Sequence, residues 1–216
     1  MSNNIPQCQL YLISPQDVGG DFPQRLTRAL QAGPVAAFQF RVKGVEQHEA
    51  AKLAAPLQEI CAAHDVAFII NDDVGLAKRL GADGVHLGQN DGSPKDARQE
   101  LGDDVQIGVT CHASRHLAME AGEQGADYVA FGQFFPSATK DSDHRAETEL
   151  LEFWSNLFEI PQVAIGGITP ENCQPLIEAG ADFLAVSGAV WNGDEGEVVK
   201  AFNEALGKYK RVHREG

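Results

Sequence analysis

The sequence predicts a (β/α)8 barrel, in which eight parallel strands alternate with helices around a closed ring. Eight short apolar runs alternate with segments of helical periodicity along the chain. The runs are almost continuously apolar, as in parallel sheets that are covered on both faces. The tripeptide Gly-Ala-Asp recurs at Gly81, Gly125 and Gly180, each time just before a predicted strand. An open doubly wound sheet is the alternative, but its G-x-G-x-x-G fingerprint is absent after the first run.

Each predicted strand is followed by a predicted helix. The strands are expected at residues 9–14, 36–44, 66–70, 84–88, 106–111, 128–132, 162–167 and 183–188. The helices are expected at residues 22–32, 46–64 and 74–80, from 94 onward, and at 114–124, 148–157, 170–179 and 197–208. Ser93, Ser114 and Thr169 are expected to cap helices, because a hydroxyl oxygen can accept a bond from a free backbone N–H. We therefore expect one domain over residues 1–216, with its core at about 7–208 and a basic tail at 209–216.

The composition narrows the possible partners. The formal net charge of −14 argues against nucleic acid as the main partner. An anionic ligand must then be held by a few local cations, by backbone N–H groups and by metal. The four cysteines share no C-x-x-C spacing, and no apolar stretch approaches the length of a membrane span. We expect a reduced, cytoplasmic protein with no membrane partner, and a homo-oligomer remains open.

Two acidic residues follow neighbouring predicted strands. Asp72 comes directly after residues 66–70 and Asn71, and Asp91 follows residues 84–88. Because the carboxyl ends of adjacent parallel strands lie at the same edge of a sheet, the two carboxylates can share one rim. Two carboxylates that converge there can hold a hard divalent cation.

Positive charge is expected near this rim. Gln39, Arg41 and Lys43 alternate with apolar residues in the second predicted strand, so all three side chains point to one side. A solvated strand face is the structural alternative. However, adjacent cations would repel each other unless an anion lay between them, and this favours an anion site.

Three further segments have the composition of phosphate sites. Ser137, Thr139 and Lys140 offer two hydroxyls and one ammonium in the loop after the sixth strand. Gly167 follows the seventh strand, and Ser187-Gly188 ends the eighth. Small residues allow backbone N–H groups to approach an anion closely, and the last two loops are the usual phosphate site of this fold. His86 lies inside a strand and is more simply an interior histidine with satisfied hydrogen bonds.

Five segments of the chain, in register from about residue 9 to 191, resemble the thiamine phosphate synthase family. They are residues 39–43 (QFRVK, for Q-L-R-x-K), 70–72 (IND), 81–91 (GADGVHLGQND, for G-A-D-G-V-H-L-G-Q-x-D), 137–140 (SATK, for T-x-T-K) and 164–168 (AIGGI) followed by Asn172. The resemblance implies a magnesium-dependent transferase. Such an enzyme joins a pyrimidine methyl diphosphate to a thiazole phosphate and releases pyrophosphate.

The resemblance also implies a role for each matching residue. Gln39, Arg41, Lys43 and Asn71 would hold the pyrimidine diphosphate, with Thr110 on the pyrimidine and Lys140 on the diphosphate. Asp72 and Asp91 would bind Mg2+. Ser137, Thr139, Gly167, Ser187 and Gly188 would hold the thiazole phosphate. Arg41, Lys43 and Lys140 would carry the catalysis by neutralising the departing diphosphate.

The sequence departs from the family pattern at several positions. Thr110 and Ser137 exchange one hydroxyl residue for another, and Gln133 stands where proline is usual. The segment 141–148 departs most. A thiazole tautomerase-like isomerase is the nearest alternative, but that branch has histidine at the position of Gln133 and lacks the features of Asp91 and Lys140. A non-catalytic paralogue that binds thiamine intermediates is the other alternative.

Overall fold

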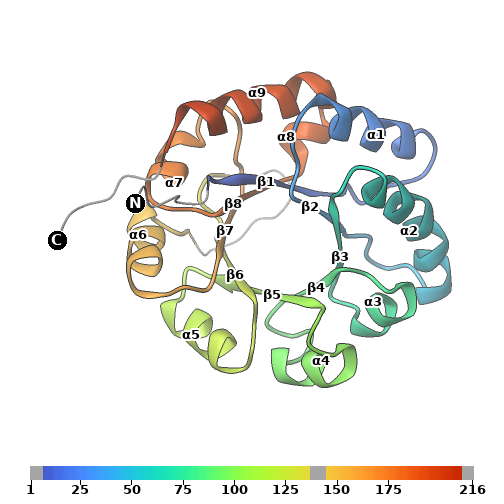
Figure 1. Cartoon of the computed structure of the whole chain (residues 1–216), viewed down its shortest axis with the longest axis horizontal. Helices are drawn as coiled ribbons and strands as arrows, with labels where there is room; N and C mark the ends of the chain where they lie inside the picture. The colour runs from blue at the N-terminus through green and yellow to red at the C-terminus, as the bar shows by residue number, and fades with distance from the viewer. Residues whose placement is uncertain (1–6, 137–144, 211–216) are drawn as a thin grey trace.

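The computed structural model describes residues 7–136 and 145–210 and contains a closed barrel of eight parallel strands. The strands follow one another around the ring in chain order, and the helices lie outside them (Figure 1). The strands are β1 Gln9–Ile13, β2 Ala37–Phe40, β3 Ala67–Asn71, β4 Gly84–Leu87, β5 Gln106–His112, β6 Tyr128–Gly132, β7 Gln162–Ile165 and β8 Phe183–Val186. The barrel that the sequence predicts is therefore confirmed.

Nine helices are described outside the masked positions. They are α1 Phe22–Ala32, α2 Gln47–Ala62, α3 Val74–Leu80, α4 Pro94–Leu101, α5 Arg115–Glu123, α6 Thr148–Leu157, α7 Gln174–Glu178, α8 Gly188–Trp191 and α9 Glu195–Lys208. Ser93 and Ser114 cap α4 and α5 as expected, since their hydroxyls accept bonds from Asp96 N and Leu117 N. Among the helices of the described ranges, none is both long and apolar enough to cross a membrane.

The seventh helix begins later than the sequence predicts. Thr169 was expected to cap a helix from residue 170, but α7 starts at Gln174. The side chain of Asn172 forms two hydrogen bonds with the backbone that precedes it. It accepts from Thr169 N (2.8 Å) and donates to Gly167 O (2.9 Å). These bonds hold the chain in a turn, because an Asn side chain competes with helical backbone hydrogen bonds.

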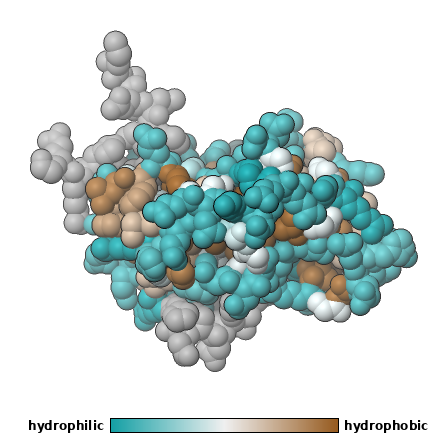
Figure 2. Space-filling view, turned by 90° about the horizontal axis from the view of Figure 1, so that it is seen from below, coloured by the Kyte–Doolittle hydropathy of each residue, from teal (hydrophilic) through white to brown (hydrophobic). Residues whose placement is uncertain are grey.

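The apolar residues form two layers. The larger layer lies between the strands and the surrounding helices and includes Phe38, Phe68, Trp154 and Phe202, all almost fully buried. The smaller layer fills the barrel interior and is built around Tyr11, Ile69 and Tyr128. The face of the molecule shown in Figure 2 is mostly hydrophilic, with apolar residues in small separate groups. The interior is thus a packed core, and chemistry is confined to the ends of the strands.

The Gly-Ala-Asp tripeptides close the N-terminal end of the barrel. Each glycine has a positive φ (59°, 89° and 101°), which ends the preceding helix without the strain that a side chain would add. Each aspartate then accepts a hydrogen bond from a backbone N–H at the start of the preceding strand. These bonds join Asp83 Oδ2 to Phe68 N (2.7 Å), Asp127 Oδ2 to Ile107 N (2.6 Å) and Asp182 Oδ2 to Gln162 N (2.9 Å). The repeat therefore fixes neighbouring strands to one another.

Candidate active site at the C-terminal ends of the strands

Two consecutive aspartates follow β3. The first lies at the barrel mouth, and the second caps the next helix. Asp72 has a φ of 66° and donates its backbone N–H to His86 O of β4 (2.8 Å). Asp tolerates this left-handed conformation better than most residues, which turns the chain sharply at the rim. Asp73 instead caps α3, because its Oδ1 accepts from Leu76 N (2.8 Å). Asp72 is therefore the residue free for chemistry.

The loop after β4 brings a second carboxylate to the same place. Asp91 Oδ2 accepts a bond from Gly88 N (3.1 Å), which folds the loop back on the end of the strand. A Cβ atom at position 88 would lie only 2.5 Å from that oxygen. Glycine is thus needed at position 88 for the carboxylate to sit where it does.

The two carboxyl groups lie together at the rim. Burial raises the pKa of Asp91, and the negative charge of Asp72 and a hydrogen bond with its side chain raise it further. Lys43 supplies a counter-charge, with its Nζ 2.9 Å from Asp72 Oδ2. Because the Lys43 side chain is 53% exposed, it only partly compensates the pair. The arrangement is therefore an acidic pair whose two negative charges are only partly balanced by one lysine.

These donors fit a hard divalent cation. Mg2+ prefers oxygen ligands and is commonly held by one or two carboxylates together with substrate phosphates and water. No group of three or more histidine, cysteine, aspartate or glutamate side chains suited to a metal occurs in residues 7–136 and 145–210. Two protein ligands at the rim are thus the set that the described residues offer.

The second strand is shorter than the sequence predicts. It ends at Phe40, so Arg41 and Lys43 lie in the loop above it and not on a strand face. Side chains from the loop after β1 continue the pairing there. Ser14 Oγ accepts from Arg41 N (2.9 Å), and Gln16 bonds both Lys43 N (3.1 Å) and Lys43 O (2.6 Å). Ser14 and Gln16 thus position Arg41 and Lys43 and were not predicted; their only signal in the sequence is their place directly after a strand.

Gln39 and Thr110 point into the upper barrel. Gln39 is 3% exposed and donates through Nε2 to the hydroxyl of Tyr11 (2.9 Å). Thr110 lies at an irregularity in the pairing of β5 with β6, where its backbone oxygen accepts from Gln89 Nε2 (2.6 Å). His86 Nε2 lies 2.8 Å from Thr110 Oγ1. His86 is therefore an interior histidine with partners, as expected, and it touches a residue predicted to contact substrate.

Burial sets the charge of that histidine. Desolvation lowers the pKa of His86 to about 4, the charge of Asp72 opposes this change, and the charge of Arg41 adds to it. The imidazole is neutral at pH 7. It can therefore donate one hydrogen bond and accept another.

Gly167, Ser187 and Gly188 lie at the ends of β7 and β8. The order of strands places these ends across the ring from β3 and β4. Gly167 has a φ of 62°, and a Cβ there would lie 2.4 Å from Pro136 O. Local packing therefore explains why position 167 is a glycine. Ser187 and Gly188 begin the short helix α8, which was not predicted. Ser137, Thr139 and Lys140 lie outside the described residues.

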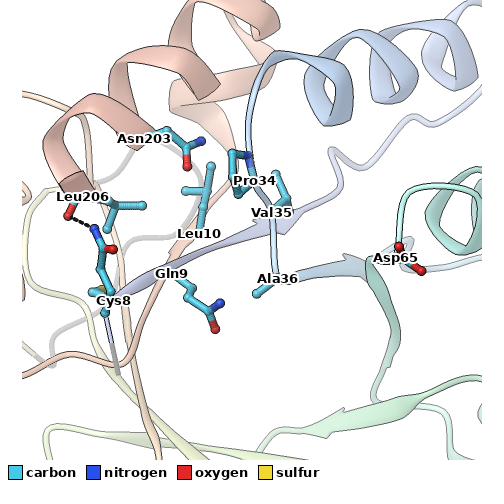
Figure 3. A pocket seen from close by; sticks show the side chains of 10 residues that line it. Cys8, Gln9, Leu10, Pro34, Val35, Ala36, Asp65, Asn203 and Leu206 are labelled. Carbon is cyan, nitrogen blue, oxygen red and sulfur yellow. Dashed lines mark hydrogen bonds between the residues drawn. The ribbon is translucent and has the colours of Figure 1, made fainter. Parts of the chain in front are cut away.

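A separate hollow lies at the other end of the barrel. It has a volume of about 630 Å3 and is lined by residues that precede β1, β2 and β3 and by α9 (Figure 3). Gln9, Ala36 and Asp65 mark its wall at the strand starts, and Asn203 and Leu206 mark its helical side. None of the predicted site residues lines this hollow.

Comparison with known proteins gives the family of the chain and agrees with the fold. The family described as thiamine monophosphate synthase matches residues 10–190. A thiamine-phosphate synthase of Erythrobacter litoralis is 74% identical over 202 residues, which are 92% of this chain and 95% of that protein. One from Rhodospirillum centenum is 48% identical over 97% of this chain and its own full length.

A solved structure of the same kind gives the same result. The thiamine phosphate pyrophosphorylase of Pyrococcus furiosus superimposes with a TM-score of 0.83 and is 28% identical, covering 95% of this chain and 98% of its own. The matched family segment covers all eight strands of the barrel except Gln9, the first residue of β1. The chain therefore belongs to the thiamine monophosphate synthase family.

Proposed function

We propose that the chain is a thiamine-phosphate synthase. The reaction joins 4-amino-2-methyl-5-(diphosphooxymethyl)pyrimidine to a thiazole phosphate and yields thiamine phosphate and pyrophosphate. One structural observation supports the assignment most directly. The carboxyl groups of Asp72 and Asp91 meet beside Lys43 at the mouth of a barrel whose relatives bear that name. Such a pair serves a metal-bound diphosphate better than it serves a neutral ligand.

In this proposal Asp72 and Asp91 hold Mg2+, which would neutralise negative charge on the diphosphate oxygens when bound. Lys43 lies beside the acidic pair, and Arg41 lies near enough to His86 for its charge to lower the pKa of that residue. Both would add positive charge on this side of the mouth. The resemblance adds Lys140 and Asn71 as further diphosphate contacts. These groups would supply local positive charge to the diphosphate in a chain whose net charge is −14.

The bond that breaks joins the pyrimidine methylene carbon to the diphosphate oxygen, and both electrons leave with the diphosphate. Arg41, Lys43 and Lys140 stabilise the charge that develops on the departing oxygen. The 4-amino group of the pyrimidine delocalises the resulting cation, and the thiazole nitrogen then donates its lone pair to the methylene carbon. This route needs no nucleophile from the protein.

We place the thiazole phosphate across the mouth from the metal, at the ends of β7 and β8. Gly167, Ser187 and Gly188 lie there, and Ser137 and Thr139 complete the set by resemblance. Two anion sites on opposite sides of one mouth suit two phosphorylated substrates. The separation also keeps their like charges apart.

Cytoplasmic activity is part of the proposal. Cys8, Cys61, Cys111 and Cys173 are all buried, and buried thiols suit a reducing compartment.

The test is to mix the purified full-length chain with both phosphorylated heterocycles and to measure thiamine phosphate with Mg2+ and with EDTA. We expect product with Mg2+ and a loss of at least about 100-fold in rate with EDTA, since charge compensation at the leaving group is removed. No product with Mg2+ would contradict the proposal. Isomerisation of the thiazole without coupling would contradict it too and would favour the tautomerase-like alternative.

A further inference from the structure

Five side chains from five different strands form one continuous line of hydrogen bonds through the barrel interior. Gln39 Nε2 donates to Tyr11 OH (2.9 Å), and Tyr11 OH lies 3.0 Å from Tyr128 OH. Tyr128 OH lies 3.1 Å from His86 Nδ1, and His86 Nε2 lies 2.8 Å from Thr110 Oγ1. The line begins and ends at residues that resemblance assigns to the pyrimidine substrate. Its three middle members have no such assignment.

The middle of the line is closed to solvent. Tyr11 is 3% exposed, and His86 and Tyr128 are each 8% exposed. The ring of Tyr128 stacks on His86 at 5.6 Å and meets the ring of Tyr11 edge-on at 6.2 Å. Polar groups buried in this way need hydrogen-bond partners, and here each finds them within the line.

Gly108 makes room for this arrangement. It pairs with Tyr128 across β5 and β6, and a Cβ at position 108 would lie 1.9 Å from Tyr128 Cζ. No side chain could be accommodated there without displacing the tyrosine ring. The strand therefore carries a glycine where the phenol crosses the interior, and the line depends on it.

One direction of the line starts from its amide end. Gln39 Nε2 can donate but not accept, so the Tyr11 oxygen accepts, and in the direction that ends at Thr110 the Tyr11 proton goes to Tyr128. Tyr128 then donates to His86 Nδ1. A neutral imidazole that accepts at Nδ1 carries its proton on Nε2, and it donates that proton to Thr110 Oγ1.

Both phenols in the middle of the line have a proton to donate. Burial raises the pKa of Tyr11 to about 12 and raises that of Tyr128 well above its ordinary value, so both phenols keep their protons at pH 7. Each phenol can then accept one bond and donate another. Thr110 at the far end accepts from His86, and its own hydroxyl proton is left for a ligand.

We propose that this line of hydrogen bonds orients the Thr110 hydroxyl as a donor, and so selects a pyrimidine with an unprotonated ring nitrogen beside its 4-substituent. A 4-aminopyrimidine offers a lone pair at that nitrogen. A 4-oxopyrimidine carries a hydrogen there and would face the Thr110 proton with its own. Tyr11, Tyr128 and His86 are positioning residues in this proposal, which rests on the proposed function for the identity of the ligand.

Thr110 is also fixed from its backbone side. Gln89 Nε2 donates to Thr110 O (2.6 Å) at the irregular point of β5, and a β-branched side chain has few χ1 choices. The direction of the hydroxyl proton is then the main freedom left to this residue. The bond from His86 removes that freedom.

The first test measures the tautomer of His86 in the full-length wild-type chain by 15N NMR with labelled histidine. The signal is assigned by its loss in His86→Asn. We expect the proton on Nε2 at pH 7. A proton on Nδ1 would overturn the proposal, because the line would then run the other way. This measurement needs neither substrate nor turnover.

The second test compares kcat/KM for the 4-amino and the 4-oxo pyrimidine diphosphates in Tyr11→Phe and Tyr128→Phe. Tyr209→Phe is the matched control, since the third tyrosine lies at the end of α9 and outside the line. We expect the preference for the 4-amino compound to fall about tenfold in both line variants and to stay unchanged in the control. An unchanged preference in a line variant with a normal melting temperature would overturn the proposal.

The two tests separate this inference from the proposed function. If the wild-type chain makes no thiamine phosphate from the 4-amino compound, the proposed function fails and the pyrimidine selectivity fails with it. If product forms and the selectivity does not depend on Tyr11 or Tyr128, only the present inference fails.

Discussion

The two ends of the barrel use aspartate in opposite ways. At the N-terminal end, Asp83, Asp127 and Asp182 each accept a backbone N–H at the start of the preceding strand, at 2.6–2.9 Å. At the C-terminal end, Asp72 and Asp91 lie against each other, and the pKa of Asp91 rises through burial and the neighbouring charge. Aspartates that stabilise the fold are supplied with donors. The aspartates at the site of the proposed chemistry have negative charge that nearby cations only partly balance.

This comparison predicts its largest effect at Asp72. Replacing Asp72→Asn should lower kcat/KM by roughly 100-fold or more at saturating Mg2+, since one of the two proposed metal ligands is lost. Asparagine tolerates the positive φ of 66° at this position, so the melting temperature should change little. Turnover and thermal unfolding measured on one preparation give both values. Near-normal turnover would show that the acidic pair is not the metal site.

At the opposite end, Asp127→Ala should cost stability and spare activity. Asp127 Oδ2 accepts from Ile107 N (2.6 Å) and from Arg98 Nη2 (2.5 Å), and hydrogen bonds to a charged group of this kind contribute about 2 kcal/mol. A loss of that size lowers the melting temperature of a chain this long by about 4–8 °C. Asp104→Ala, at an exposed position in the preceding loop, is the matched control. A fall in kcat instead would mean that the two ends are not independent.

Asp73→Ala sharpens the comparison, since Asp73 is the sequence neighbour of Asp72. Its carboxylate caps α3 through Leu76 N (2.8 Å), and the loss of such a cap costs about 1 kcal/mol. We expect the melting temperature to fall by about 2–4 °C while kcat stays within about twofold of wild type. A large loss of turnover would show that Asp73, and not only Asp72, is needed for activity.

The fold and the acidic pair could be predicted because their signals are local. The alternation of apolar runs gives the barrel, and parallel strands bring Asp72 and Asp91 to one edge. The Gly-Ala-Asp repeat also signals the three helix ends. What a local pattern misses is a side chain that replaces a backbone partner. Asn172 delays α7 in this way, as Ser14 and Gln16 do where β2 ends.

The interior line of hydrogen bonds was not predictable for a related reason. Tyr11 and Tyr128 are 117 residues apart, and each reads as an ordinary aromatic residue in an apolar run. Their contact depends on the closure of the ring and on the glycine at position 108. Pairing of this kind depends on the whole barrel, so no single segment carries its signal.

The smallest expected effect concerns the stability of Asp91→Asn. A folded-state pKa above the ordinary carboxyl value means that the folded chain binds the proton more tightly than the unfolded chain, so ionisation of Asp91 destabilises the fold. The penalty is absent below the unfolded pKa of about 3.9, grows as the pH rises above that value, and is complete above the folded pKa. Asparagine removes it and can still accept from Gly88 N. At pH 7 without Mg2+, we therefore expect the variant to melt about 1–2 °C above wild type, since solvent screens this exposed group. The gap should close as the pH is lowered toward 4, and a variant that melts below wild type at pH 7 would show that the two carboxylates do not compete for positive charge.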